Sequence, residues 1–473
     1  MIDADRLAWS IDALAGANPE LSARRVLSRA QVVTMLVVFG VVAAIAFFAP
    51  RTTAIVAIAT ITVVYASISA FRFWLFLVGL RRGSTVFVTD ADALAIPDDE
   101  LPVYTVLLPA YREPDIVIEL VTGIGNLDYP RDKLDVRVLL EADDDETVAA
   151  ARAIRELEDW ATVELVPPSE PRTKPKACNW GLATARGEFV TIYDAEDVPE
   201  PLQLRRAVVA FRRLGPSVSC LQARLGYHNY RQNLLTRFFG IEYDTWFTNL
   251  LPGLAALGVP LPLGGTSNHL RTDVLRAVHG WDPYNVTEDA DLGIRLNRLG
   301  YHSAVLHSMT LEEANSDVIN WVKQRSRWEK GYLQTGLVHL RSPRRLVREL
   351  GWKGALGFLL LIPGTPTLAI MNAVMWSIAL LWWLGTPVAI ADLYPETLLH
   401  ISLAVTVFGG AATIYVSLVV VAREEQPVQA LLCLLLPLYW LLMTVAACKA
   451  LIQLITAPSY WEKTTHGLDR PPG

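Results

Sequence analysis

The chain has 473 residues, of which 52% are hydrophobic and only 19% are charged. This composition is too apolar for an ordinary soluble enzyme, and the net charge of −6 provides no basic stripe for nucleic acid. The four cysteines show no CxxC spacing, which argues against a zinc site or a disulfide framework and fits a reducing compartment. They are Cys178, Cys220, Cys433 and Cys448.

The amino-terminal part of the chain begins polar and then becomes strongly apolar. Residues 1–31 are predicted to be a cytoplasmic segment, and they lack the charged start and cleavage site of a signal peptide. About 20 apolar residues cross a hydrocarbon core roughly 30 Å thick. Residues 32–49 and 53–71 meet this requirement, so 32–82 is predicted to hold two transmembrane helices and an interfacial end.

Residues 83–350 have the charge-bearing composition of a globular domain and alternate between strand and helix patterns. The βαβα order predicts an α/β fold with a mostly parallel sheet, in which ligands bind at the carboxyl ends of the strands. The expected strands cover residues 103–108, 136–140, 163–166 and 189–193. The expected helices cover residues 115–123, 149–160, 179–186 and 290–299.

Residues 351–456 are again apolar, and 457–473 form a polar carboxyl-terminal segment. Spans are predicted within 356–384 and 397–422, and the Lys and Arg residues that flank the spans predict a cytoplasmic middle domain. The run 428–456 contains Pro437 and Lys449, and both disfavour an ordinary span. We therefore expect four crossings, with 428–456 along the inner face, and five crossings as the alternative.

An acidic cluster, Asp194-Ala195-Glu196-Asp197, follows the last predicted strand. Two carboxylates one residue apart suit Mg²⁺ or Mn²⁺ that holds a substrate diphosphate. The competing interpretation is a solvated acidic turn, which the nearby prolines permit. Taken alone, the cluster does not decide between the two.

A second acidic motif, Thr287-Glu288-Asp289, precedes a predicted helix. An acid at this position is often a helix cap. The functional interpretation makes Asp289 a general base, which requires a carboxylate within hydrogen-bond reach of an acceptor hydroxyl.

Two motifs with basic residues likewise have both a functional and a structural interpretation. Gln324, Arg327 and Trp328 share one face of a predicted helix, where a guanidinium could bind a diphosphate and an aromatic ring could support a sugar. A basic amphipathic helix at the membrane surface is the alternative. Lys174, just before another predicted helix, could reach phosphates or could lie in a solvated loop.

The order of these motifs resembles the processive family 2 glycosyltransferases, the group that includes cellulose, chitin and hyaluronan synthases. Three stretches are similar to a bacterial exopolysaccharide-synthase subgroup, namely 264–269, 285–293 and 461–467. The resemblance implies a glycosyltransferase A-type domain flanked by transmembrane and interfacial helices. It also implies that 461–467 is a mobile segment that closes over the donor, as in those synthases.

The resemblance further implies a uridine pocket lined by Tyr111, Glu113 and Glu141. The usual Asp-Asp-Gly turn of the family is Glu141-Ala142-Asp143 here. Asp143 could therefore serve in place of Glu141.

For the diphosphate, the resemblance implies contacts from Lys174 and Arg327, with Asp194 and Glu196 as ligands of Mg²⁺ or Mn²⁺. The usual Asp-x-Asp motif is Asp194-x-Glu196 in this chain, which leaves Asp197 as a rival ligand. Asp289 would be the catalytic base, and Gln324 and Trp328 would lie at the acceptor end.

The predicted function is inverting, metal-dependent transfer from a UDP-sugar to a growing β-linked glycan at the cytoplasmic membrane. Non-processive transfer to a membrane lipid is the first alternative, and a nucleotide-regulated transporter is a less favoured one. No residue pattern identifies the sugar or an export partner.

Overall fold

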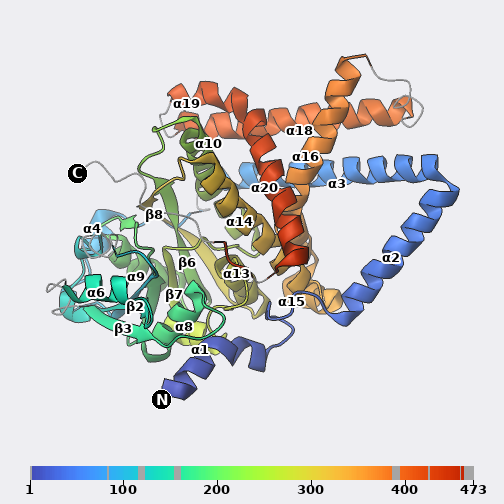
Figure 1. Ribbon diagram of the computed structural model, residues 1–473. Helices are drawn as coiled ribbons and strands as arrows, with labels where there is room; N and C mark the ends of the chain where they lie inside the picture. Colours follow the sequence, from blue (N-terminus) through green and yellow to red (C-terminus); the bar gives the residue numbers. More distant parts are fainter. Residues whose placement is uncertain are drawn as a thin grey trace.

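The computed structural model describes residues 3–81, 85–114, 123–153, 161–385, 395–423, 427–458 and 460–462. An α/β domain lies beside a group of long apolar helices, and the amino-terminal helix lies against the domain (Figure 1). Parts of three predictions fall outside the described residues. These are most of the helix expected at 115–123, the end of that expected at 149–160, and the segment 463–467.

The core of the domain is a sheet with the strand order β3-β2-β1-β4-β7-β6-β8-β5. Its first four strands pair in parallel, as predicted. The remainder is mixed, because β7 runs antiparallel to both β4 and β6, while β6 and β8 are parallel. The strands are β1 (Tyr104–Ala110), β2 (Leu134–Glu141), β3 (Ala161–Val166), β4 (Phe189–Ile192), β5 (Val198–Pro199), β6 (Val218–Tyr227), β7 (Asn268–Arg271) and β8 (His302–Glu312).

Helices cover both faces of the sheet. On β1, Val106 and Leu108 pack in one apolar cluster with α9 (Gln203–Leu214), whereas Leu107 packs in another with α8 (Lys174–Thr184). This alternation follows from the two-residue period of a strand. Helices α6 (Asp145–Ala153), α12 (Thr272–Ala277) and α13 (Glu288–Arg298) complete the domain around the strands.

Five helical segments in the described part of the chain are long and apolar enough to cross a membrane. Four are the helices α2 (Arg29–Phe48), α3 (Pro50–Gly79), α16 (Gly364–Trp383) and α18 (Glu396–Arg423), and the fifth runs over Gln429–Thr456. They overlap the predicted apolar runs. None of the residues of α2 is buried in the protein, as expected for a helix that faces lipid.

The fifth apolar run is divided where the sequence predicted a break. Helix α19 (Pro427–Leu432) is followed by a 3₁₀ turn at Cys433–Leu435 and then by α20 (Leu436–Thr456), with Pro437 in the first turn. Helix α20 packs against α14 (Val318–His339) and α16. Length and hydropathy allow this run to span, so its course along the inner face stays a prediction.

Helices α10 (Leu234–Thr245), α11 (Leu251–Leu257) and α15 (Pro343–Leu361), with a π-helical turn at Trp246–Leu250, connect the domain to the apolar helices. In this region α10 packs against α18 and α11 packs against α3. The α/β domain and the long helices therefore form one packed unit.

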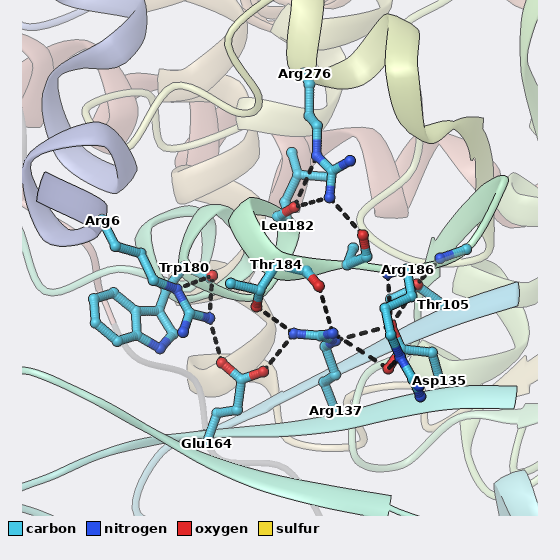
Figure 2. Close-up of polar contacts among 12 residues, drawn as sticks. Arg6, Thr105, Asp135, Arg137, Glu164, Trp180, Leu182, Thr184, Arg186 and Arg276 are labelled. Atoms are coloured by element: carbon cyan, nitrogen blue, oxygen red, sulfur yellow. Dashed lines mark hydrogen bonds and ion pairs between the residues drawn. The ribbon is translucent and has the colours of Figure 1, made fainter. Parts of the chain in front are cut away.

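The amino-terminal helix α1 (Asp3–Ala17) is docked on α8, as Figure 2 shows. The Arg6 guanidinium lies 4.0 Å from the ring centroid of Trp180, and its Nε donates a 2.9 Å hydrogen bond to the Trp180 carbonyl. Arg6 also pairs with Glu164 of β3, which accepts a 2.6 Å bond from Arg137. This network fixes the position of α8, which begins at Lys174. The first residue of α8 lies near the carboxyl ends of the parallel strands, where ligands bind in sheets of this kind.

Candidate active site

A cavity of about 800 Å³ opens where the carboxyl ends of β1, β2, β4 and β8 meet α13 and α14. It continues between α3, α16, α18 and α20. The structure brings nearly all of the predicted site residues to its wall. These are Tyr111, Glu113, Glu141, Lys174, Asp194, Glu196, Asp289, Gln324, Arg327 and Trp328.

The acidic turn after β4 is held together by Asp197. Its Oδ2 accepts a 2.6 Å hydrogen bond from the Asp194 backbone N–H and another from the Thr266 hydroxyl. Burial, followed by repulsion from the neighbouring acids, raises the pKa of Asp197 well above its usual value. This carboxylate therefore has a clear structural task in the turn, which separates it from Asp194 and Glu196.

Asp194 faces the cavity beside a cation of the protein. Lys174 Nζ donates to Asp194 and, at 2.8 Å, to the Gly265 carbonyl. Burial acts to lower the pKa of Lys174, but the charge of Asp194 outweighs it and the net shift is upward. The lysine therefore stays protonated next to the acidic turn.

The donor set of this turn fits a hard divalent cation. Burial, with repulsion from Asp197 and Asp194, raises the pKa of Glu312 well above its usual value, so carboxylates gather here in excess of cations. Asp197 Oδ1 is also buried with no hydrogen-bond partner among the described residues. Within those residues, no three His, Cys, Asp or Glu side chains form a ready metal cluster. Mg²⁺ or Mn²⁺ would thus need substrate phosphate oxygens as well as two carboxylates, which is usual for Mg²⁺.

Asp289 lines the cavity from the first turn of α13, whose N-cap residue is Thr287. Its Oδ1 accepts a 2.7 Å hydrogen bond from the Ala290 backbone N–H at the start of α13. Its Oδ2 points toward Gly265, where an added Cβ would lie 3.4 Å from it. Burial raises the pKa of Asp289, and burial with the Asp289 charge raises the pKa of Glu288 to about 7. A half-buried carboxylate that lines the cavity near Lys174 is where a catalytic base would be expected.

The predicted face of α14 does line the cavity, but its three side chains differ in what they contact. Gln324 Oε1 is occupied by a 2.9 Å hydrogen bond from Asn315 Nδ2. The rings of Trp328 and Tyr243 are stacked, with their centroids 6.3 Å apart. Arg327 lies under Trp461, 4.9 Å from the ring centroid. Arg327 and Trp328 therefore offer more to a ligand than Gln324 does.

The predicted uridine end contains a cation that sequence reasoning missed. Arg172 Nη1 donates a 3.1 Å hydrogen bond to the Tyr111 hydroxyl, and Nη2 lies 2.8 Å from Asp143 Oδ2. Glu141 Oε1 lies 2.8 Å from Nζ of Lys176, which is completely buried. Glu141 thus lines the cavity while bound to a buried lysine, and Asp143 lies beside the cavity next to Arg172. The signal for Arg172 was its place two residues before Lys174 in the sequence.

Sequence reasoning also missed the charged residues on the membrane side of the cavity. Four of them line its wall: Arg72, Glu242, Arg325 and Glu329. Arg72 directly follows the span predicted at 53–71, and only the structure places it within a longer helix, α3.

Comparison with known proteins finds a family and several relatives that resemble the α/β domain. Residues 102–331 match the family model described as "Glycosyltransferase like family 2". The "Probable glycosyltransferase YdaM" of Bacillus subtilis (strain 168) is 28% identical over 252 residues, which are 53% of this chain and 60% of that protein. The "Beta-monoglucosyldiacylglycerol synthase" of Synechocystis sp. (strain ATCC 27184 / PCC 6803 / Kazusa) is 29% identical over 292 residues, 60% of this chain and 58% of that protein. The chain thus spans less than two thirds of the length of both relatives.

The fold has a solved counterpart. A mannosyltransferase from Pyrobaculum calidifontis, in complex with GDP-Man and Mn²⁺, superposes with a TM-score of 0.55 at 20% identity. The alignment covers 84% of this chain and 98% of that one. This likeness confirms the predicted α/β fold of glycosyltransferase A type.

Proposed function

Because residues 102–331 match the family model described as "Glycosyltransferase like family 2", we propose that the protein is an inverting membrane glycosyltransferase. It transfers a sugar from a nucleoside-diphosphate donor, UDP-linked in our expectation, to a hydroxyl of an acceptor glycan. One observation carries this proposal. A single cavity joins the strand ends that hold the acidic turn to the space between the apolar helices.

At the donor end, Lys174 and Arg327 would contact the diphosphate, with Tyr111, Arg172 and Glu141 around the nucleoside. A bound Mg²⁺ or Mn²⁺, held by Asp194 and Glu196, would add positive charge to the leaving diphosphate. The guanidinium and ammonium groups lie in a buried site, where fixed charges stabilise developing charge most strongly.

At the reaction centre, Asp289 accepts the proton of the attacking hydroxyl. The acceptor oxygen forms a bond to the anomeric carbon as the bond to the diphosphate oxygen breaks. A single displacement inverts the configuration, so an α-linked donor gives a β-linked product. No enzyme-bound intermediate is required.

A growing glycan is the acceptor that we favour. Between the helices the cavity is lined by aliphatic side chains and by aromatic and neutral polar ones, the latter including Trp440, Tyr439, Asn372 and Ser417. The aromatic and polar groups suit sugars better than alkyl chains. A membrane-lipid acceptor is the second candidate, and its support is the similarity to the Synechocystis protein named for a glucolipid. The cytoplasmic membrane is the proposed location.

The test uses the purified full-length protein in detergent with UDP-glucose, UDP-N-acetylglucosamine, UDP-galactose and GDP-mannose. We expect release of nucleoside diphosphate from one of them and products of increasing length on gel filtration. A product of a single fixed mass that partitions with lipid would favour the second candidate. If none of the four donors is consumed, transfer from these nucleotide sugars is refuted.

A separate prediction concerns Trp461, which lies over Arg327 in the cavity wall. The neighbouring Glu462 is tied to α20 by a 2.8 Å contact with Lys449 and a 3.0 Å hydrogen bond from Gln453. Replacing Trp461 with alanine should lower the transfer rate about tenfold, the scale of a desolvated cation–π contact. The melting temperature should change little, because the indole anchors no apolar core.

Trp352→Ala is the matched control, because Trp352 is 67% exposed and lies outside the cavity. It should leave transfer at the wild-type rate. Equal rates for Trp461→Ala and the wild type would exclude Trp461 from donor closure.

A further inference from the structure

Two segments beside the first candidate span concentrate positive charge that the proposed reaction does not use. Residues 21–31 contain three arginines and no acid, and residues 341–353 contain five Lys or Arg residues and one acid, Glu349. The whole chain, in contrast, has a net charge of −6. None of these eight cations lines the cavity. They are Arg24, Arg25, Arg29, Arg341, Arg344, Arg345, Arg348 and Lys353.

Folding brings the two segments together. Arg341 Nη1 donates hydrogen bonds of 2.9 Å and 3.0 Å to the carbonyls of Pro19 and Glu20. Gln31, in the first turn of α2, donates a 2.8 Å hydrogen bond to the Leu337 carbonyl near the end of α14. The start of α2 therefore lies next to α15 (Figure 1). We call the exposed cations of the two segments the basic surface, which consists of Arg24, Arg25, Arg29, Arg344, Arg348 and Lys353.

The acids near the basic surface are already paired with other residues. Glu349 lies 2.6 Å from Arg345 and 2.7 Å from Arg298, and Glu20 lies 3.4 Å from Arg345. Within the described parts of the chain, four arginines of the basic surface make no side-chain hydrogen bond or ion pair. These are Arg25, Arg29, Arg344 and Arg348. Their like charges repel one another, and an anionic partner would relieve that repulsion.

Two features place the basic surface at the level of the lipid headgroups. Helix α2 is a candidate span that begins at Arg29, and none of its residues is buried in the protein. Helix α15 changes character at Gly351, whose φ of 68° interrupts the helical backbone. Before this point, Arg344 and Arg348 are exposed one turn apart. After it, the exposed side chains other than Lys353 are apolar and recur at helical spacing. They are Trp352, Leu356 and Leu359.

We propose that the basic surface binds the headgroups of anionic phospholipids in the leaflet next to the α/β domain. Guanidinium groups match the geometry of phosphate oxygens, and Lys or Arg residues beside a span attract anionic lipids. The exposed apolar side chains that follow Gly351 would contact the acyl chains of the same lipids. This inference goes beyond the proposed transfer reaction and does not depend on it.

The combination of charged and apolar side chains favours an anionic phospholipid over other occupants. A soluble phosphate would neutralise the arginines but would leave the exposed ring of Trp352 without an apolar partner. A neutral lipid would cover Trp352 but would leave the arginines without counter-charges. An anionic phospholipid does both, and the Lys353 ammonium, 5.8 Å from the centroid of the Trp352 ring, lies where the two kinds of side chain meet.

The unaltered protein provides the first test. The full-length chain, delipidated in a neutral detergent, is mixed with equal amounts of phosphatidylglycerol and phosphatidylcholine, and the retained lipids are measured by native mass spectrometry. We expect phosphatidylglycerol to be retained in about tenfold excess, because each basic residue near the membrane surface adds to the attraction. Equal retention of the two lipids would overturn the proposal. Displacement of phosphatidylglycerol by millimolar inorganic phosphate would also overturn it, because the occupant would then be a soluble anion.

The double variant Arg344→Gln with Arg348→Gln provides the second test. Each cation near an anionic surface strengthens binding roughly fivefold, so the preference for phosphatidylglycerol should fall about fivefold or more. The melting temperature should not change, because neither side chain has a partner in the described protein. Arg344→Lys with Arg348→Lys keeps both charges and should retain most of the preference. A double glutamine variant with the wild-type preference would refute the basic surface as the lipid site.

A matched control removes the same charge elsewhere. Arg152 of α6 and Arg212 of α9 are exposed on the α/β domain, and their double replacement by glutamine should leave the lipid preference unchanged. An equal loss of preference in this control would show that net charge, and not the basic surface, selects the lipid. Sugar transfer plays no part in these measurements, so failure of the proposed transferase function would leave the test intact.

Discussion

Replacing Asp289 with asparagine is expected to lower turnover by about 10²-fold or more, the scale of a lost general base. The amide keeps the shape of the side chain but cannot take the proton of the attacking hydroxyl. Nucleotide binding, measured by calorimetry, should persist because Lys174 and Arg327 are untouched. Near-normal turnover of Asp289→Asn would remove this residue from the mechanism.

Helix capping is the competing explanation for such a loss, and the chain offers a matched control. Asp273 is the second residue of α12 (Thr272–Ala277) and accepts a 2.8 Å hydrogen bond from the next backbone N–H, as Asp289 does at the second position of α13. Asp273 does not line the cavity. Asp273→Asn should therefore retain turnover while showing any small loss of stability due to the cap.

The pH dependence of turnover provides a further check on Asp289. Burial raises its pKa, and Glu288 beside it has a pKa of about 7. As the pH falls through this region the pair takes up a proton, so the rate should decrease on the acid side. Glu288→Gln removes a neighbouring negative charge, which lowers the proton affinity of Asp289. In that variant, the decrease of the rate at acid pH should occur at a lower pH than in the wild type. An unchanged pH dependence would contradict an electrostatic interaction between Glu288 and Asp289.

Chelation of divalent metal is expected to abolish transfer, with a decrease of about 10²-fold or more, because the diphosphate would leave without its main charge partner. Mg²⁺ or Mn²⁺ should restore the rate. Asp194→Ala should weaken Mn²⁺ binding in the presence of UDP, as followed by electron paramagnetic resonance. Full activity in EDTA would show that the enzyme works without a metal ion.

Two further variants distinguish residues that bind the metal ion from residues that only stabilise the acidic turn. Asp197→Asn should lower the melting temperature more than it lowers Mn²⁺ affinity, because Asp197 bonds to the Asp194 backbone and to Thr266. Asp145→Ala, at an exposed acid outside the cavity, should change neither quantity. A larger effect on Mn²⁺ affinity from Asp197→Asn than from Asp194→Ala would make Asp197 the ligand.

The first four strands, their parallel pairing and the position of the acidic turn could be predicted from the sequence alone. All three depend on local patterns: short apolar runs form strands, and the residues that follow parallel strands meet at one edge of the sheet. The face of α14 that carries Arg327 and Trp328 was predictable for the same reason, because helical periodicity assigns residues to faces.

Strand β7 was not predictable in this way. Its residues Asn268–Arg271 include a single strongly apolar side chain, Leu270. The strand exists because its backbone pairs with β4 and β6, which flank it on either side. Such pairing joins residues far apart in the chain and leaves no local periodicity.

Only the tertiary structure could decide the partners of the charged residues. The sequence alone could not reveal that Lys176 pairs with Glu141, that Asp197 bonds to the turn, or that Arg72 lines the same cavity as Glu242 and Glu329. Composition and periodicity determine which elements form and which faces they bury. The role of a buried charge depends on the groups that folding brings within a few ångströms of it, because the energy of a charge in a low-dielectric site is set by its nearest partners.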